Sequence, residues 1–90
     1  MTQELYLEMT YRRGKPFAGY LHLPCRDGDQ AVRSRKVAPG LVVDYTEDER
    51  PLGIEIVSPG TVSIEDIQRV LSDLHCRQVT QDELAPLHSA

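Results

Sequence analysis

The stretch PGLVVDYTEDERPLGIEIV, residues 39–57, determines the fold that the sequence predicts. In residues 41–46 and 52–57, apolar side chains largely alternate with polar side chains or glycine, and the turn EDERP separates the two segments. A period of two is typical of strands with one buried face. Pairing Val43 with Ile54 across the turn gathers the apolar side chains on one face. The opposite face carries the remaining side chains of the two strands: Val42, Asp44, Gly53 and Glu55.

The same alternation predicts a hairpin earlier in the chain. Residues 5–12 (LYLEMTYR) and 17–23 (FAGYLHL) flank the turn RGKP, in which Gly14 is free to adopt a positive φ. Pairing Leu7 with Leu21 places the apolar side chains of both strands on one face. Polar and aromatic side chains then share the other face: Tyr6, Glu8, Thr10, Tyr20 and His22.

Residues 31–37 (AVRSRKV) form a weaker strand with an unusual charge pattern. Pairing Val37 with Leu41 directs Arg33 and Arg35 toward the apolar side of the sheet. Three explanations fit this pattern: a bulge that turns the side chains around, long stems that run along the sheet margin, or an edge strand whose inward charges prevent aggregation. We favour the edge strand.

Residues 63–74 (SIEDIQRVLSDL) are predicted to form an amphipathic helix. Ser63 is a favourable N-cap, and Glu65 and Asp66 place negative charge in the first turn, where the helix dipole favours it. The apolar stripe of this helix consists of Ile64, Ile67, Val70, Leu71 and Leu74.

The TQDE sequence at residues 80–83 matches a capping box, so the C-terminal tail, residues 77–90, forms either a short last helix or a frayed end. Together the elements predict an α+β fold, an antiparallel meander of about five short strands with one C-terminal amphipathic helix packed on its apolar face. We expect residues 1–76 to form a single domain.

Length and charge narrow the class of protein. Ninety residues, with 40% apolar and 27% charged side chains, are ordinary for one small globular domain. The formal net charge is −4, but residues 1–40 carry +3 and residues 41–90 carry −7. Because a nucleic-acid-binding surface needs a basic surplus, direct binding to nucleic acid is not expected. The asymmetry suits pairing between the two halves or between subunits.

Neither a membrane segment nor a cofactor site is expected. No apolar run is long enough to span a bilayer, and the first residues lack the order of a signal peptide. We therefore expect a cytoplasmic protein in which Cys25 and Cys76 stay reduced. Zinc sites usually show paired spacings such as C-x2-C, whereas here His22 precedes Cys25 as H-x2-C and His75 is adjacent to Cys76.

Two blocks of sequence, MTYRRGKPFAGYLHL (9–23) and VAPGLVVDYTEDERPLGIEIV (37–57), resemble the YuzE-like family of small bacterial domains of unknown function. In the second block an apolar strand that ends in Asp44 precedes a turn and a GIEI strand. The resemblance covers about residues 7–58; the long loop PCRDGDQAV, Arg35 and the C-terminal tail depart from it. It implies an α+β fold and a bacterial origin, but no activity. Some members are similar to antitoxin-like partners of small basic toxins.

Asp44 and Glu55 are the candidate reactive pair, because they lie diagonally across a strand pair on one face. Three interpretations fit this placement: a solvated face with cross-strand charge pairs, a subunit contact, and a proton-sharing acid/base dyad. The solvated face is the default for an antiparallel sheet, so we assign no catalytic residue. The basic turn formed by Arg12, Arg13 and Lys15 is likewise expected to be solvated.

The sequence favours interaction over catalysis. We expect a protein-interaction module of the antitoxin-like or accessory kind, whose acidic second half meets a small basic protein. An alternative is a self-assembling homodimer formed through the open sheet face or an edge, with Tyr6, Tyr20 and Val42 as its anchors. A third hypothesis is a small-ligand binder or an enzyme that uses Asp44 and Glu55.

Overall fold

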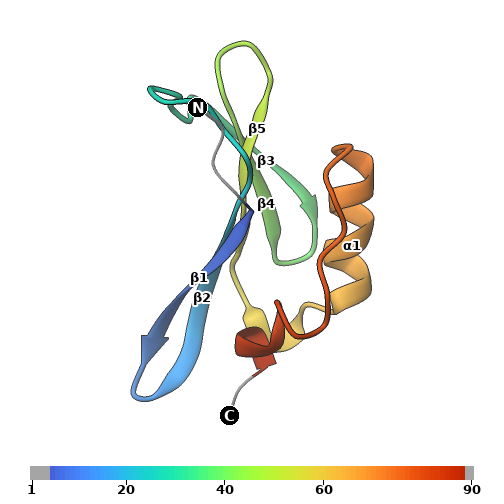
Figure 1. Cartoon of the computed structure of the whole chain (residues 1–90). Helices are drawn as coiled ribbons and strands as arrows, with labels where there is room; N and C mark the ends of the chain where they lie inside the picture. Colours follow the sequence, from blue (N-terminus) through green and yellow to red (C-terminus); the bar gives the residue numbers. More distant parts are fainter. Residues whose placement is uncertain (1–4, 89–90) are drawn as a thin grey trace.

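Five strands form one antiparallel sheet in the computed structural model, which describes residues 5–88 (Figure 1). The order of the strands across the sheet is β1-β2-β5-β4-β3, and a single α-helix, α1, follows them in the described part of the chain. The strands are β1 (Tyr6–Arg12), β2 (Lys15–His22), β3 (Arg33–Ala38), β4 (Leu41–Tyr45) and β5 (Pro51–Ile56). The predicted α+β fold with a five-stranded antiparallel sheet is therefore confirmed.

The strand order corrects the predicted meander. β3, β4 and β5 are neighbours in sequence and in space, but β5 also pairs with β2, so β3 lies at the far edge of the sheet. Strands β2 to β5 therefore have the spatial order of a Greek key. Alternation along a strand distinguishes its two faces but does not identify its neighbours, which is why the sequence alone suggested the simpler order.

The predicted register holds at the centre of the strand pairs and shifts toward their ends. Leu7 pairs with Leu21, and the central residues of β4 and β5 also pair as predicted. At the end of β3 a register shift pairs Leu41 with Ala38 instead of Val37, the predicted partner. A bulge of this kind is common at a sheet edge, where only one neighbour constrains the strand.

β3 is an edge strand, as we favoured from its charges. Arg33 Nη1 donates a hydrogen bond of 2.7 Å to the carboxylate of Glu49. The guanidinium of Arg35 lies 5.1 Å from the centre of the Tyr45 ring, a cation–π contact. The two arginines therefore cover the margin of the sheet with their stems and keep their charged groups at the surface.

Helix α1 (Ile64–Asp73) begins where the capping residue predicts. The Oγ of Ser63 accepts a hydrogen bond of 3.0 Å from the main-chain N–H of Asp66. A short 3-10 helix, η1 (Pro59–Thr61), connects β5 to this cap. Figure 1 shows α1 beside one face of the sheet, and its buried side chains share one core cluster with those of the strands. These buried helix residues are Ile67, Val70 and Leu71.

Residues 77–88 also contribute to the core. Thr80 and Glu83 make both hydrogen bonds of the predicted capping box, 2.9 and 3.1 Å long. A turn and a 3-10 helix, η2 (Ala85–His88), follow, instead of an α-helix. Gln68 of α1 accepts a hydrogen bond from the main-chain N–H of Val79 and donates one to its carbonyl oxygen. The buried side chains of this segment are Val79, Leu84 and Leu87.

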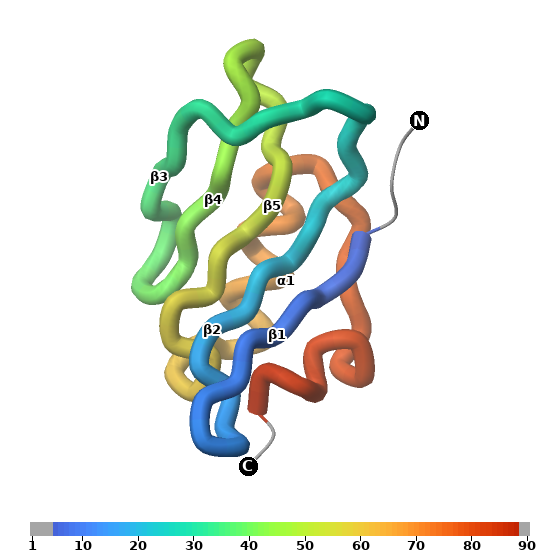
Figure 2. The backbone as a smooth tube through the Cα atoms, turned by 90° about the vertical axis from the view of Figure 1, so that its left-hand side faces the viewer, coloured from blue at the N-terminus to red at the C-terminus, as the bar shows by residue number. Residues whose placement is uncertain are grey.

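The loop of residues 23–32 carries the chain from β2 to the far edge, across the end of the sheet (Figure 2). It must pass the ends of β5 and β4, and neighbouring strands lie about 4.8 Å apart. This crossing accounts for the length of the loop, which exceeds that of a hairpin connection.

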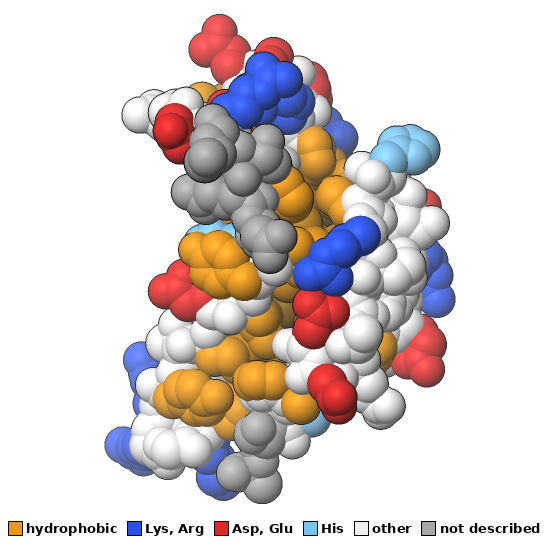
Figure 3. Space-filling model, in the orientation of Figure 1, with side chains coloured by type: hydrophobic (Ala, Val, Ile, Leu, Met, Phe, Trp, Pro, Cys, Tyr) orange, Lys and Arg blue, Asp and Glu red, His pale blue; other side chains and the backbone are white. Residues whose placement is uncertain are grey.

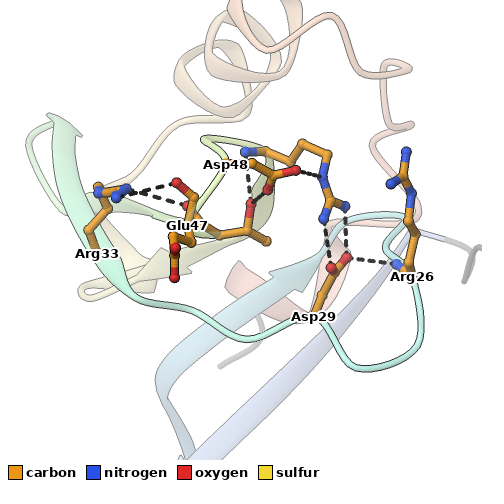
Figure 4. Close-up of polar contacts among 7 residues, drawn as sticks. Arg26, Asp29, Arg33, Glu47 and Asp48 are labelled. Carbon is orange, nitrogen blue, oxygen red and sulfur yellow. Dashed lines mark hydrogen bonds and ion pairs between the residues drawn. The ribbon is translucent and has the colours of Figure 1, made fainter.

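An ion-pair cluster fixes this loop to the β4–β5 turn (Figure 4). Arg50 donates two hydrogen bonds, of 2.9 and 2.8 Å, to the two carboxylate oxygens of Asp29. Asp29 also accepts a hydrogen bond of 2.8 Å from the main-chain N–H of Arg26. These donors favour the charged carboxylate, with the hydrogen bonds from Arg50 contributing most, and lower the pKa of Asp29 to about 2.

Candidate functional site

The face of the sheet that turns away from α1, here called the open face, is directed toward the viewer in Figure 2. Two rows of residues on it cross all five strands. Because the strands pair in register, residues opposite one another point to the same side. One row consists of Tyr6, His22, Gly53, Asp44 and Ser34. The other consists of Glu8, Tyr20, Glu55, Val42 and Lys36.

All five residues singled out from the sequence lie on this open face. Tyr6 and Asp44 belong to the first row, and Tyr20, Val42 and Glu55 belong to the second. They come from β1, β2, β4 and β5. The structure therefore brings the candidate anchors and the candidate carboxylates together on one surface.

Tyr20 reaches across β5 to bind Asp44 on β4. Its phenol donates a hydrogen bond of 2.9 Å to Oδ2 of Asp44, while Ser34 on β3 donates one of 2.6 Å to Oδ1. The Tyr20 ring occupies the space directly above Gly53, where a β-carbon at that residue would collide with it. Gly53 therefore provides the gap that lets a side chain of β2 contact one of β4.

The Tyr20 phenol is held in its protonated form. Partial burial, followed by the hydrogen bond to Asp44, raises its pKa above the ordinary value of 10.0. At neutral pH it therefore acts as a hydrogen-bond donor that orients Asp44, and not as a base. Both oxygens of the Asp44 carboxylate thus accept a hydrogen bond from a hydroxyl group, one from Ser34 on the adjacent strand β3 and one from Tyr20 on β2, beyond β5.

A second group of contacts connects β1 to β2 beside Tyr20. Nε2 of His22 lies 2.7 Å from Oε1 of Glu8, a hydrogen bond in which the ring nitrogen donates. Tyr6 stacks on the His22 ring with a centroid distance of 4.3 Å, and Tyr20 meets its edge at 4.7 Å. Three rings thus form a continuous aromatic surface next to the carboxylates.

Asp44 and Glu55 lie on one face, on adjacent strands and diagonal to each other, as predicted. Within residues 5–88, no hydrogen bond joins their two carboxylates, and Asp44 is directed toward hydroxyl groups instead. The two rows contain three carboxylates, those of Glu8, Asp44 and Glu55, and one ammonium, that of Lys36. Such a surface is suited to charge pairing with a basic partner.

The cysteines and the other histidines are dispersed. Cys25 and Cys76 are free thiols, and burial raises the pKa of the Cys76 thiol. His88 makes a hydrogen bond to the carbonyl oxygen of Val62, and no group of three or more potential metal ligands gathers among residues 5–88. In that same part of the chain, no helix has the length and apolar character needed to cross a membrane.

The sequence did not indicate two features of the structure. The contact from Tyr20 to Asp44 depends on the position of β5 between β2 and β4, which alternation does not reveal. A hollow of about 250 Å³ between β3 and α1 is lined by Arg35, Tyr45 and Arg69, among others, and depends on tertiary packing. It lies on the helix side of the sheet, and is therefore separate from Asp44.

Residues 18–58 match a family model described as "Protein of unknown function (DUF2283)". The matched segment runs from within β2 to just beyond β5 and contains Tyr20, Val42, Asp44 and Glu55, but not Tyr6. No curated protein and no solved structure matches the chain. The comparison therefore relates the segment from β2 to β5 to a domain of unknown function and carries no activity with it.

Proposed function

We propose that this chain is a non-enzymatic protein-interaction module whose open face binds a small basic protein. The observation that carries the proposal is the composition of the two rows that cross that face, in which three aromatic rings lie beside three carboxylates and one lysine. Aromatic side chains supply contact area, and unlike charges steer the partner and fix its orientation.

The open face is organised before any partner arrives. Tyr20 is held by its hydrogen bond to Asp44 and by its contact with Gly53, and Tyr6 is held by stacking on His22. Because these rings are already fixed, binding loses little side-chain entropy. Glu55, on the central strand β5, is exposed and free to meet a lysine or an arginine of the partner.

The resemblance to the YuzE-like family supports the same class of function, since some of its members are similar to antitoxin-like partners of small basic toxins. We further propose a cytoplasmic location, which fits two free thiols in the described chain. A catalytic use of Asp44 finds less support, because hydroxyl donors occupy both of its oxygens.

The proposal is tested by affinity capture from the host with two variants of equal charge change. Glu55→Lys reverses a charge at the centre of the open face, and Glu65→Lys reverses one at the exposed start of α1. We expect the wild-type chain and Glu65→Lys to retain a near-stoichiometric basic protein that high salt releases. Glu55→Lys should retain roughly tenfold less, because like charges now face each other.

Equal capture by the two variants would exclude the open face as the binding surface. Recovery of the chain alone, without any basic protein, would contradict the proposal itself.

A further inference from the structure

Among residues 5–88, no strand pairs with the outer edge of β1. β1 lies at one end of the sheet, and within residues 5–88 no hydrogen bond joins its main chain to any element other than β2. Side chains along it are exposed or partly exposed from Tyr6 to Arg12. A free strand edge presents a row of N–H and C=O groups that can pair with another strand.

The two edges of the sheet differ in how they are protected. β3 carries Arg33, Arg35 and Lys36 within six residues and is interrupted by a register shift. Two copies of β3 would therefore bring like charges together. β1 contains neither lysine nor proline, and its register shift against β2 comes only after Thr10, so this edge lacks such protection.

The core is also incompletely covered along β1. The β1 edge faces the viewer in the orientation of Figure 1. In the same orientation, Figure 3 shows a strip of hydrophobic side chains between the sheet and α1. Leu7 and Met9 of β1 are only partly buried against the core. Tyr11 on β1 and Phe17 on β2 are 52% and 48% exposed. A strand added beside β1 would shield this strip from water.

We propose that β1 pairs antiparallel with β1 of a second copy of this chain, which joins two sheets into one of ten strands. In this arrangement the charged side chains of β1 in one copy are complementary to those of β1 in the other. With Thr10 on the two-fold axis, Glu8 of each copy lies opposite Arg12 of the other, on the same face of the sheet. Met9 then faces Tyr11 of the other copy on the core side, a sulfur–aromatic contact.

This pairing goes beyond the proposed function, because it uses an edge and not the centre of the open face. Each copy would keep Tyr20, Asp44 and Glu55 accessible for a different partner. The two-fold symmetry also makes the assembly closed, since each chain uses its β1 edge once and its β3 edge repels a further copy.

The test is the mass of the purified chain in solution, measured by sedimentation from about 1 μM to about 1 mM, the range expected for a small interface. We expect a rise from 10.2 kDa to twice that mass and no further. Glu8→Arg places like charges opposite each other twice, and should weaken dimerisation at least about tenfold. Combining Glu8→Arg with Arg12→Glu should restore it. The control Lys36→Glu, on β3, should leave the dimer unchanged.

Several results would overturn this pairing: a mass that stays at 10.2 kDa, growth beyond the dimer, a dimer insensitive to Glu8→Arg, or a double variant that fails to restore it. A thiol-specific crosslinker tests the register in a chain whose two cysteines are replaced by serine. Thr10→Cys on the axis should give crosslinked dimers, and Lys36→Cys should not. Because these experiments use the chain alone, their outcome is independent of the capture experiment with Glu55→Lys.

Discussion

Gly53 and Tyr20 show how one absent side chain shapes the open face. Tyr20 lies in the space that a side chain at residue 53 would occupy, and from this position its phenol reaches Asp44. The sequence placed all three residues on one face. It did not reveal their contact, because Tyr20 and Asp44 lie on strands separated by β5, and no local pattern encodes that order.

We expect Gly53→Ala to displace the Tyr20 ring and break its hydrogen bond to Asp44, at a cost of about 1–3 kcal/mol in the free energy of unfolding. In a Tyr20→Ala background the same substitution should cost far less, because the ring is absent. Denaturant unfolding of the four chains of this cycle measures the coupling.

Gly60→Ala is the matched control, since nothing lies within 4 Å of a β-carbon placed there. Equal costs of Gly53→Ala with and without the Tyr20 ring would show that the contact does not constrain this site.

At the scale of elements, the alternation of side chains and the capping residues predicted the features that short stretches of sequence encode. The strands, the N-cap at Ser63 and the capping box at residues 80–83 are each encoded within a few residues. The position of β3 is not local, because it depends on a loop that crosses the end of the sheet and on the anchoring of Asp29 by Arg50. The burial of Leu84 is also not local, since its segment shows no repeating apolar stripe.

Leu84 tests whether residues 77–88 unfold together with the sheet. Its side chain is 0% exposed within the common core cluster. Leu84→Ala should therefore lower the free energy of unfolding by about 2–5 kcal/mol, the range for large-to-small core substitutions. Gln81→Ala, at an exposed site of the same segment, should change it by less than about 0.5 kcal/mol.

The measurement is denaturant unfolding followed by circular dichroism. If the two alanine variants unfold at the same midpoint, the segment contributes nothing to the cooperative core.

At the scale of the whole molecule, charged side chains are grouped into regions: some stabilise the fold, and others lie on the surfaces proposed for binding. The ion pair of Asp29 with Arg50 connects the loop crossing the sheet to the β4–β5 turn, and that of Glu83 with Arg77 stabilises the C-terminal segment. The two rows of the open face contain more acids than bases, and the β1 edge carries one acid, Glu8, and one base, Arg12. The net charge of −4 does not reveal this arrangement, because opposite charges from distant parts of the chain offset one another in the sum.

The two structural ion pairs make stability depend on acid pH. Hydrogen bonds from Arg50 lower the pKa of Asp29 from 3.8 to about 2, and those from Arg77 lower the pKa of Glu83 from 4.5 to about 2. Both groups bind fewer protons in the folded chain than in the unfolded chain over this interval. The stabilisation is therefore complete above the unfolded values and is lost as pH falls through the folded ones.

We accordingly expect the free energy of unfolding to be nearly constant between about pH 5 and pH 7 and to fall between about pH 4.5 and pH 2. Asp29→Asn should make this fall shallower, because one of the carboxylates with a lowered pKa no longer titrates. Asp27→Asn, at an exposed site of the same loop, is the matched control and should leave the slope unchanged. Urea unfolding at a series of pH values gives the slopes, with the chain dilute enough to keep association from contributing. A slope for Asp29→Asn as steep as that of the wild-type chain would mean that the bond from Arg50 does not distinguish the folded carboxylate from the unfolded one.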